Sequence, residues 1–596
     1  MPLFSKVLVA NRGEIVIRVF RTLRELGIGC VAIYSEPDRR SAHVRAADEA
    51  YLIGPGPAAE SYLRGEVLVE TALRAGAEAI HPGYGFLAEN AEFARRVEQA
   101  GLTWVGPPPD AIELMGTKTA ARRAMREAGV PIVPGAVDPV QSAGDVVELG
   151  DEIGYPMIIK AAAGGGGKGM EIVRAPDEAE RAFDAATRQG ERYFADPAVY
   201  VERYVENPRH IEVQVLADAH GNVVHLGERD CTIQRRHQKL VEETPSPAVD
   251  DALRAHIGQI GVDAARAAGY RSAGTVEGLL TSDGDYFFME MNTRIQVEHT
   301  VTEAVTGLDL VREQLAIAAG EPLSVGQRDV VLRGHAIECR INAEDVTSGF
   351  LPAPGPITAY RPPAGPGVRV DSGVEAGDEV IGLYDPLIAK LVVHDVDRTR
   401  AIDRMLRALA EFRIEGTPTL LGFHRALLEH PCFRAGETCA GVVESPELAK
   451  RAKQIQESFS HQATNVRPTS DGAFSTVPRL VGVEVDGRAY DIRLHVTEPP
   501  WAELARRRRS RGRGGRDGSV NGAVASPMQG TVLTVAVANG DRVVAGQLLL
   551  VVEAMKMENE IVAPREGVVS GLAVTVGAGV SSGQLLCLVV AEPDGK

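Results

Sequence analysis

Five polar residues alternate with other residues in one stretch near the middle of the chain. They are Glu290, Asn292, Arg294, Gln296 and Glu298. In an extended strand, alternate side chains lie on one face, so this spacing predicts a shared polar face. A ladder of structural salt bridges is the alternative interpretation. The mixture of carboxylates, amides and a guanidinium favours a site that binds a cation and an anion together.

A metal site is the first part of that prediction. Glu277 ends an earlier candidate strand that begins at Gly274. Carboxylate and amide oxygens suit Mg²⁺, which usually binds one or two carboxylates together with substrate phosphates. We therefore expect Glu277, Glu290 and Asn292 to hold a divalent cation beside a phosphate-bearing substrate.

A run of four glycines follows an apolar stretch that ends in Lys160. The run is Gly164, Gly165, Gly166 and Gly167. Glycines let backbone N–H groups approach phosphate oxygens without a side-chain clash. The run is not a Walker loop, because that motif needs Gly at Ala162 and Ser or Thr at Gly169. A flexible linker is the alternative, but the apolar runs on both sides favour a hairpin that covers phosphates.

The segment 228–239 is dense in cations and amides and includes Gln234, His237 and Lys239. Proteins that bind single-stranded nucleic acid place aromatic side chains among their cations, and this segment has no Phe, Tyr or Trp. We expect the segment to bind an anion beside a nucleotide.

The elements that position these residues begin with a parallel α/β pattern. Apolar runs at residues 7–10 and 30–34 flank a helical pattern that ends at Gly27. Strand, helix and strand in this order predict a doubly wound α/β unit. Residues 11–14 do not match G-x-G-x-x-G, so a dinucleotide site has no support. The glycine-containing loop at residues 81–87 fits an ordinary turn as well as a functional loop.

Length and composition limit the possible functions. At 596 residues the chain needs on the order of three to five domains. The net charge of −17 argues against general nucleic-acid binding. No apolar run approaches the roughly 20 residues that span a membrane, and the first strand begins too early for a signal peptide. The six cysteines are scattered, so we expect them to be reduced and structural in a cytoplasmic protein.

Between residues 451 and 522 the composition changes to that of a linker. Residues 481–494 alternate around Asp486 and Gly487, which predicts a β-hairpin with a type I′ turn. Because so small a hairpin does not fold alone, we infer a docking element or the remnant of a bridging domain. Residues 506–516 are rich in Arg, Gly and Ser and predict a flexible basic linker, with RNA binding as the alternative.

The C-terminal part contains an internal repeat. Gly530 matches Gly567, and residues 546–549 match residues 583–586, an offset of 37. Two similar β units with glycine turns predict a flattened β-barrel with pseudo-twofold symmetry. Lys556 lies between the two copies, where an exposed hairpin tip is expected. We interpret Lys556 as the attachment point of a covalent cofactor, with an exposed structural lysine as the alternative.

Together these motifs resemble a known enzyme family. Lys118, Lys160, the glycine run, segment 228–239 and residues 290–298 are similar to biotin carboxylase, a member of the ATP-grasp family. The resemblance extends over residues 3–445. The repeat resembles the biotinyl/lipoyl carrier fold. Residues 554–557 match its biotin attachment motif, because lipoyl domains lack the paired methionines.

The resemblance implies a multidomain α/β protein. Its parts are a Rossmann-like N-terminal domain (1–115), an ATP-grasp domain with a glycine-rich lid (116–330), an α+β C-terminal carboxylase domain (331–450), a linker with a small β-hairpin (451–522) and a carrier domain of flattened β-barrel type (523–592). Ala163 stands where the family often has Gly, and Lys168 where some members have Arg. Neither departure removes a required group, since the lid acts chiefly through its backbone.

The resemblance also implies a role for each candidate site residue. ATP would be bound, under the glycine lid, by Lys118, Lys160, Glu202, Arg203, Val205, His210, Gln234 and His237. Bicarbonate would be bound by Lys239, Arg294, Gln296 and Val297, and Mg²⁺ or Mn²⁺ by Glu277, Glu290 and Asn292. In catalysis, Glu298 would be the general base for bicarbonate, Arg340 would stabilise negative charge on biotin, and Lys239 and Arg294 would assist.

The implied activity is ATP-dependent carboxylation of biotin, attached to Lys556, with bicarbonate. ATP would activate bicarbonate as carboxyphosphate. Because no segment is left for carboxyl transfer, a carboxyltransferase β subunit is implied in trans, with a biotin protein ligase and a homo-oligomer within an α/β assembly. The resemblance is strongest to α subunits of acetyl-/propionyl-CoA carboxylases. The alternatives are another acyl-CoA as acceptor, or a biotin-bearing scaffold with an inactive ATP site.

Overall fold

The computed structural model describes residues 3–136, 138–161, 170–194, 197–464, 476–485, 488–497, 522–554, 557–581 and 583–590. They fall into two compact units, Met1–Gln456 and Glu457–Lys596. None of the described helices combines the length and the hydropathy that crossing a bilayer requires.

The first unit begins with a parallel five-stranded sheet in the order β3-β2-β1-β4-β5. The strands are β1 (Lys6–Val9), β2 (Gly29–Ser35), β3 (Glu49–Gly54), β4 (Ala79–His81) and β5 (Thr103–Trp104). Val7 and Val9 belong to one apolar cluster and Leu8 to another, so both faces of the sheet are buried. Burial on both faces explains why these strands are uninterrupted apolar runs. The predicted doubly wound unit is confirmed.

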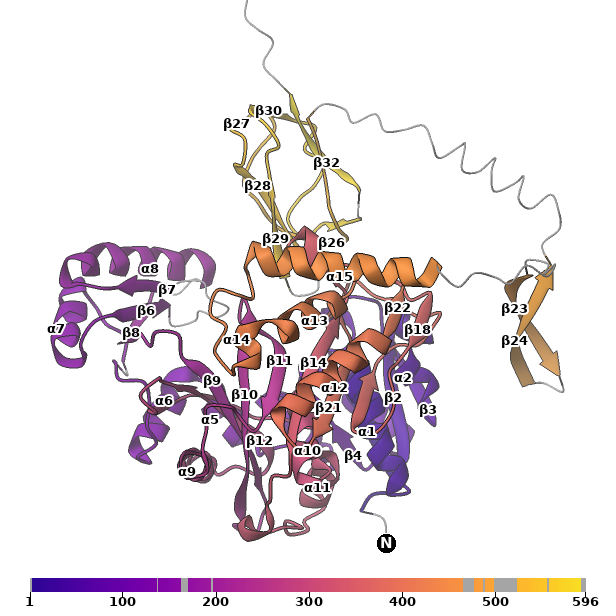
Figure 1. Ribbon diagram of the computed structural model, residues 1–596, viewed down its shortest axis with the longest axis horizontal. Helices are drawn as coiled ribbons and strands as arrows, with labels where there is room; N and C mark the ends of the chain where they lie inside the picture. The colour runs from indigo at the N-terminus through magenta and orange to yellow at the C-terminus, as the bar shows by residue number, and fades with distance from the viewer. Residues whose placement is uncertain are drawn as a thin grey trace, which may run out of the picture. The chain divides into compact units, whose positions relative to one another are not determined.

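An antiparallel eight-stranded sheet forms the centre of the first unit (Figure 1), in the order β13-β12-β9-β10-β11-β14-β21-β19. The strands are β9 (Arg209–Ala217), β10 (Val223–Arg235), β11 (Gln238–Thr244), β12 (Ser272–Leu280), β13 (Tyr286–Asn292), β14 (His335–Asn342), β19 (Val368–Ser372) and β21 (Leu387–Asp395). Helices α9 (Asp251–Ala267), α10 (His299–Thr306) and α12 (Arg398–Glu411) pack on it. Every candidate bicarbonate or metal residue lies on this sheet or in the turn after β13.

A three-stranded sheet, β7-β6-β8, packs against helices α7 (Ala143–Ile153) and α8 (Ala179–Phe194) (Figure 1). Its strands are β6 (Met157–Ala161), β7 (Met170–Val173) and β8 (Val199–Arg203). Strands β6 and β7 pair antiparallel, so the predicted strands on both sides of the glycine run are confirmed. The four glycines themselves lie outside the described residues.

Shorter elements complete the first unit. The helices are α1 (Glu14–Glu25), α2 (Ala42–Arg45), α3 (Gly65–Ala75), α4 (Ala91–Gln99), α5 (Pro109–Gly116), α6 (Lys118–Glu127), α11 (Leu310–Ala318), α13 (Leu421–Glu429) and α14 (Pro431–Arg434), and α15 (Pro446–Thr464) crosses into the second unit. The two-stranded ladders pair β15 (Glu344–Asp345) with β16 (Leu351–Pro352), β17 (Gly355–Pro356) with β20 (Glu379–Val380), and β18 (Ala359–Arg361) with β22 (Arg413–Glu415).

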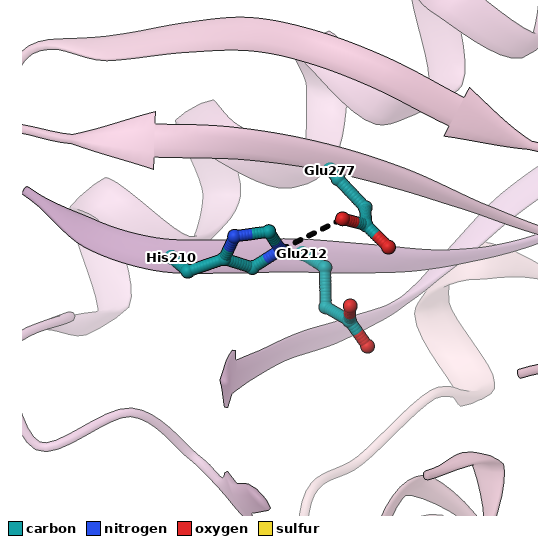
Figure 2. Close-up of side chains that lie close together, drawn as sticks. All are labelled: His210, Glu212 and Glu277. Carbon is teal, nitrogen blue, oxygen red and sulfur yellow. Dashed lines mark ion pairs between the residues drawn. The ribbon is translucent and has the colours of Figure 1, made fainter. Parts of the chain in front are cut away.

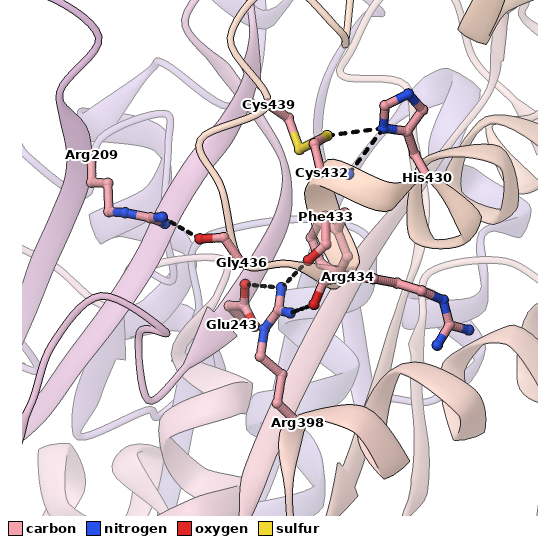
Figure 3. The surroundings of a disulfide bond; sticks show 9 residues. All are labelled: Arg209, Glu243, Arg398, His430, Cys432, Phe433, Arg434, Gly436 and Cys439. Atoms are coloured by element: carbon pink, nitrogen blue, oxygen red, sulfur yellow. Dashed lines mark hydrogen bonds and ion pairs between the residues drawn. A yellow bond between two sulfur atoms is a disulfide. The ribbon is translucent and has the colours of Figure 1, made fainter.

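One cysteine pair differs from the sequence-based expectation. Cys432, in α14, and Cys439 form a disulfide across a Cα–Cα distance of 5.6 Å (Figure 3). The prediction that all six cysteines are reduced is therefore wrong for this pair, whereas Cys30, Cys231, Cys339 and Cys587 are free and buried. Sequence spacing does not reveal the pair, because the approach depends on how the chain turns after α14. Arg398 fixes that turn by donating to the carbonyls of Phe433 and Arg434.

The second unit contains the predicted hairpin and the repeat. Strands β23 (Thr476–Val485) and β24 (Arg488–Thr497) pair antiparallel, which confirms the hairpin; its turn residues lie outside the described residues.

The repeat forms two four-stranded sheets, β25-β32-β30-β27 and β29-β28-β26-β31. The strands are β25 (Ala523–Ala525), β26 (Gly530–Val535), β27 (Arg542–Val543), β28 (Leu548–Ala554), β29 (Met557–Val562), β30 (Gly567–Ser570), β31 (Gly579–Val580) and β32 (Leu585–Val590). Strands β30, β31 and β32 each begin 37 residues after β26, β27 and β28. Strands β25 and β29 likewise end 37 residues apart, so each sheet contains two strands from each copy, as pseudo-twofold symmetry requires. The flattened barrel is thus realised as two sheets around one apolar core, without closure among the described strands.

Candidate active site

The polar stretch 290–298 is extended only in its first part. Strand β13 ends at Asn292, and residues 293–298 turn before α10 begins at His299. The prediction of one extended polar face is therefore wrong beyond Asn292. The turn nevertheless keeps these side chains together, since Arg294 Nη2 donates to Asn292 Oδ1 at 2.9 Å and Gln296 Nε2 to Glu277 Oε1 at 2.6 Å.

The ammonium group of Lys239, on β11, lies at the centre of the cluster. Its Nζ is 2.9 Å from Glu277 Oε1, 2.7 Å from Glu298 Oε1 and 3.3 Å from Gln296 Oε1. It also donates to Glu212 on β9. Burial alone would lower the pKa of Lys239, but the three carboxylates outweigh it and raise that pKa well above its ordinary value. Lys239 is thus a permanent positive charge in the site.

The predicted metal ligands face one another across two strands. Glu277 on β12 is directly opposite Glu290 on β13, and Asn292 Nδ2 donates to Glu277 Oε1 at 2.8 Å. Desolvation by the surrounding protein and the neighbouring Glu277 charge raise the pKa of Glu290, although its side chain is still exposed. A hard divalent cation would reduce the repulsion between the two carboxylates, and it prefers oxygen ligands such as these and the Asn292 amide oxygen. These residues fit Mg²⁺ or Mn²⁺.

A second arrangement around Glu277 is drawn in Figure 2. His210 Nε2 lies 2.8 Å from Glu277 Oε2, and Glu212 lies beside them on the same strand as His210. The three side chains bring ligand atoms within 4.8 Å of one another. Both sets share Glu277 and both are held by hydrogen bonds to neighbouring side chains. Mg²⁺ prefers oxygen ligands to an imidazole nitrogen, so the oxygen set of Glu277, Glu290 and Asn292 suits it better.

Glu298 and Arg340 form the other end of the cluster. Arg340 Nη2 is 2.9 Å from Glu298 Oε2, and its Nε is 2.6 Å from Glu242 Oε1. Burial opposes ionisation of Glu298, but Lys239, Arg340 and Arg229 outweigh it and hold the pKa of Glu298 well below its ordinary value. Burial raises the pKa of Glu242 to about 7 despite Arg340. The Arg340 guanidinium thus contacts one carboxylate with a lowered pKa, Glu298, and one with a raised pKa, Glu242.

The predicted nucleotide residues are only partly brought together. Lys160 Nζ is 2.6 Å from Glu202 Oε2, and burial of Glu202 is outweighed by Lys160, Arg122 and Lys118, which lower its pKa. Lys118 opposes the rise in the pKa of Glu290, so its charge lies near the predicted metal site. His210 belongs to the Glu277 group instead.

Three other predicted residues lie at the edges of this region. Gln234 donates to the carbonyl of Cys231, and His237 is exposed at the turn between β10 and β11. Arg203 is exposed at the end of β8, and Val205, two residues later, is half-buried. The glycine run and Lys556 lie outside the described residues; the strands that flank Lys556, β28 and β29, pair at Ala554 and Met557.

Several residues of the site were not predicted from the sequence. Glu212 alternates with His210 on β9, a spacing that resembles the 290–298 pattern and could have identified it. Glu242 follows Lys239 on β11 without such a pattern. Glu89 accepts a hydrogen bond from Arg294 Nε at 2.9 Å and lies in a loop 205 residues earlier in the chain. Only tertiary structure reveals that contact.

Four family models match the chain. They are "Biotin carboxylase, N-terminal domain" at residues 3–112, "Carbamoyl-phosphate synthase L chain, ATP binding domain" at 117–325, "Biotin carboxylase C-terminal domain" at 338–445 and "Biotin-requiring enzyme" at 522–589.

Similar proteins agree with these matches. The chain is 46% identical over 567 residues to the biotin-dependent acyl-coenzyme A carboxylase alpha3 subunit of Mycobacterium leprae, covering 94% of both chains. It is 50% identical over 473 residues to a pyruvate carboxylase subunit of Methanothermobacter thermautotrophicus, covering 78% of this chain and 96% of that one. A solved structure, the biotin carboxylase domain dimer of the Hydrogenobacter thermophilus 2-oxoglutarate carboxylase with MgADP, ADP and bicarbonate, is 48% identical with a TM-score of 0.70, covering 75% of this chain and 98% of that one.

Proposed function

The chain belongs to the family of biotin-dependent carboxylases, and from this premise we propose that it is the α subunit of an acetyl-CoA or propionyl-CoA carboxylase. It catalyses the ATP-dependent carboxylation of biotin on a biotin carrier domain. The observation that supports an acyl-CoA as the acceptor is the similarity to an acyl-CoA carboxylase alpha subunit over 94% of both chains, carrier included.

The cluster around Lys239 is the proposed bicarbonate site. Lys239, Arg294 and Gln296 supply a cation, a planar fork and an amide, which suit a small planar anion. Val297 lies in the same turn and would contribute its backbone. ATP, when bound, supplies the phosphoryl group that activates bicarbonate. The residues themselves orient the anion and exclude water.

Glu298 is the proposed base, and its neighbouring cations let it accept a proton only after bicarbonate has bound. A carboxylate paired with two cations is a weak proton acceptor. Bicarbonate would draw Lys239 away from Glu298, and the pKa of Glu298 would then rise from its depressed value. In this proposal the base gains strength only when its substrate is in place, while Arg340 remains available for negative charge on biotin.

The proposal also includes a cation site, a biotin attachment residue and a partner subunit. Glu277, Glu290 and Asn292 would hold Mg²⁺ or Mn²⁺ against the phosphates, near Lys118. Lys556 would carry biotin, attached by a biotin protein ligase. A carboxyltransferase β subunit would accept the carboxyl group in trans, within an oligomer that contains both chains.

A 2-oxo acid is a second candidate acceptor. One of the similar proteins is part of a pyruvate carboxylase, and another is a 2-oxoglutarate carboxylase domain. An inactive scaffold fits less well, because a buried cluster of paired charges is costly unless a function retains it, and apolar replacement is often neutral or stabilising.

The experiment that tests this proposal is to co-purify the chain with its carboxyltransferase partner and to measure acceptor-dependent carboxylation. Acetyl-CoA, propionyl-CoA, a longer branched acyl-CoA, pyruvate and 2-oxoglutarate would be compared at equal concentration. We expect the highest kcat/KM with acetyl-CoA or propionyl-CoA. A preference for pyruvate or 2-oxoglutarate would overturn the acyl-CoA assignment and leave biotin carboxylation intact.

A further inference from the structure

A lysine that is completely removed from solvent lies behind the bicarbonate cluster. Lys390, on β21, has 0% exposure, although lysines are almost never fully buried unless they are paired. Its Nζ donates to the Val297 carbonyl at 2.9 Å and lies 3.1 Å from Glu14 Oε1. None of the motifs discussed above includes Lys390 or Glu14 as a functional residue.

The carbonyl that Lys390 binds belongs to the peptide between Val297 and Glu298. Because a peptide unit is planar, fixing this oxygen also fixes the backbone nitrogen of Glu298. Glu298 in turn contacts Lys239 and Arg340. The ammonium group of Lys390 therefore sets the starting point of the side chain proposed as the base.

Lys390 also joins segments that are distant in sequence. Glu14 is the first residue of α1 and accepts a hydrogen bond from the Tyr84 hydroxyl. The Tyr84 ring centroid is 5.9 Å from Lys390 Nζ. One buried cation thus connects β21, the start of α1, the 81–87 loop and the turn after β13. The loop at 81–87, for which an ordinary turn is the alternative interpretation, contributes to this network through Tyr84.

The charges around Lys390 come from every neighbouring strand. Across β21, Lys390 is in register with Arg340 on β14 and with Asp371 on β19. Burial raises the pKa of Glu14, and Lys390 opposes that rise. Glu14 Oε2 has no hydrogen-bond partner among the described residues. Loss of Lys390 would leave the buried Glu14 carboxylate without its counter-charge and the Val297 carbonyl without its donor.

We propose that Lys390 is a positioning residue for bicarbonate, which holds the Val297–Glu298 peptide in place and ties it through Glu14 to the Tyr84 loop. This inference rests on the proposed bicarbonate site. A merely structural ion pair between Lys390 and Glu14 is the competing explanation, and the two predict different results when both partners are replaced.

The test compares Lys390→Met with the double variant Lys390→Met/Glu14→Gln, in bicarbonate-dependent ATP hydrolysis with free biotin. Lys390→Met is expected to raise the KM for bicarbonate about tenfold, the equivalent of one lost charge-assisted hydrogen bond, while the KM for ATP changes less than about twofold. The double variant removes the unpaired carboxylate, so its Tm should recover. Its bicarbonate KM should stay high, because the Val297 carbonyl still lacks its donor.

Two results would overturn this inference. One is an unchanged bicarbonate KM in Lys390→Met, or a rise shared equally by ATP. The other is a double variant in which Tm and bicarbonate KM recover together, which would make the pair structural. A wild-type chain without bicarbonate-dependent ATP hydrolysis would instead remove the proposed function itself, and this inference with it.

Discussion

Two carboxylates on paired strands, Glu277 and Glu290, are the residue-scale feature on which the proposed cation site rests. Their strands pair in register at this point, and partial desolvation together with the Glu277 charge raises the pKa of Glu290. Glu277 stays ionised because Lys239 and His210 outweigh its burial and lower its pKa. Glu277 is therefore ionised and Glu290 is more easily protonated. A bound divalent cation would favour the ionised form of both carboxylates.

Replacing Glu290 tests that role. Glu290→Gln removes one charged ligand and keeps the side-chain shape. The Mg²⁺ concentration for half-maximal ATP hydrolysis should rise about tenfold, as expected for the loss of one favourable ligand contact. The measurement is a Mg²⁺ titration at fixed ATP, with Glu321→Gln, an exposed glutamate outside the site, as control. Overlapping titrations for Glu290→Gln and wild type would contradict the ligand role.

Glu344, on β15, permits a pH test away from the proposed chemistry. Burial raises the pKa of Glu344 from 4.5 to about 7, although Asn342 donates to it at 2.9 Å. A raised folded-state pKa contributes stability that is present below 4.5 and lost as the pH rises through 7. Above pH 7 the folded chain must bury a charged carboxylate.

Glu344→Gln mimics the protonated form at every pH. Its Tm should exceed that of the wild type by about 2–4 °C at pH 8, which corresponds to ~1 kcal/mol in a large domain. At pH 5 the two melting curves should nearly coincide. Differential scanning calorimetry at both pH values makes the comparison. An equal Tm difference at pH 5 and pH 8 would show that Glu344 does not titrate in this range.

At the scale of elements, the carrier repeat depends on glycines where two strands approach closely. A Cβ on Gly530, at the start of β26, would lie 2.3 Å from the Glu553 carbonyl oxygen. Its repeat partner Gly567 would place a Cβ 2.5 Å from the Val590 oxygen. Backbone cannot yield at such distances, so both copies require glycine for packing rather than for an unusual φ angle.

Gly530→Ala should therefore destabilise the carrier by about 1–3 kcal/mol, as overpacking usually does. We expect a smaller biotinylated fraction, measured by streptavidin gel shift on the full chain, and faster proteolysis of the C-terminal unit. Gly579→Ala is the matched control, because a Cβ there meets nothing within 4 Å. Equal biotinylation of the two variants would contradict the packing argument.

Local patterns in the sequence predicted these elements well but not how they meet. The repeat with an offset of 37 reappears strand for strand, and the strands beside the glycine run pair as expected. The alternation correctly identified Glu290 and Asn292 as strand residues. It also predicted a strand up to Glu298, whereas β13 ends at Asn292 and a turn leads to α10. Periodicity cannot show where a strand gives way to a turn when polar residues continue.

The unpredicted contacts all join segments whose approach is set by the folded chain. Glu14 and Lys390, Glu89 and Arg294, and the disulfide between Cys432 and Cys439 depend on tertiary packing or on a loop's path. A buried lysine has the same local signature as an exposed one. The partners of Lys390, the first residue of α1 and the turn after β13, are revealed only by the folded chain.

At the scale of the whole molecule, the site proposed for biotin carboxylation and the domain that carries biotin belong to different compact units. The first unit holds the charge cluster on one continuous eight-stranded sheet, and the carrier repeat in the second unit has its own apolar core. Lys556→Ala should accordingly abolish biotinylation and leave ATP hydrolysis with free biotin within about twofold of the wild type, since Lys556 is not among the residues proposed to bind ATP, the cation or bicarbonate. Streptavidin blotting and phosphate release measure the two properties separately.

The most direct test of the central claim is transfer of label from bicarbonate to the biotinylated chain itself. The purified chain is incubated with Mg²⁺, ATP and ¹⁴C-bicarbonate, without any acceptor, and protein-bound label is counted. We predict label on the wild type that requires ATP and is blocked by avidin, and none on Lys556→Ala. Label that persists on Lys556→Ala, or a fully biotinylated wild type that never acquires label, would contradict the account.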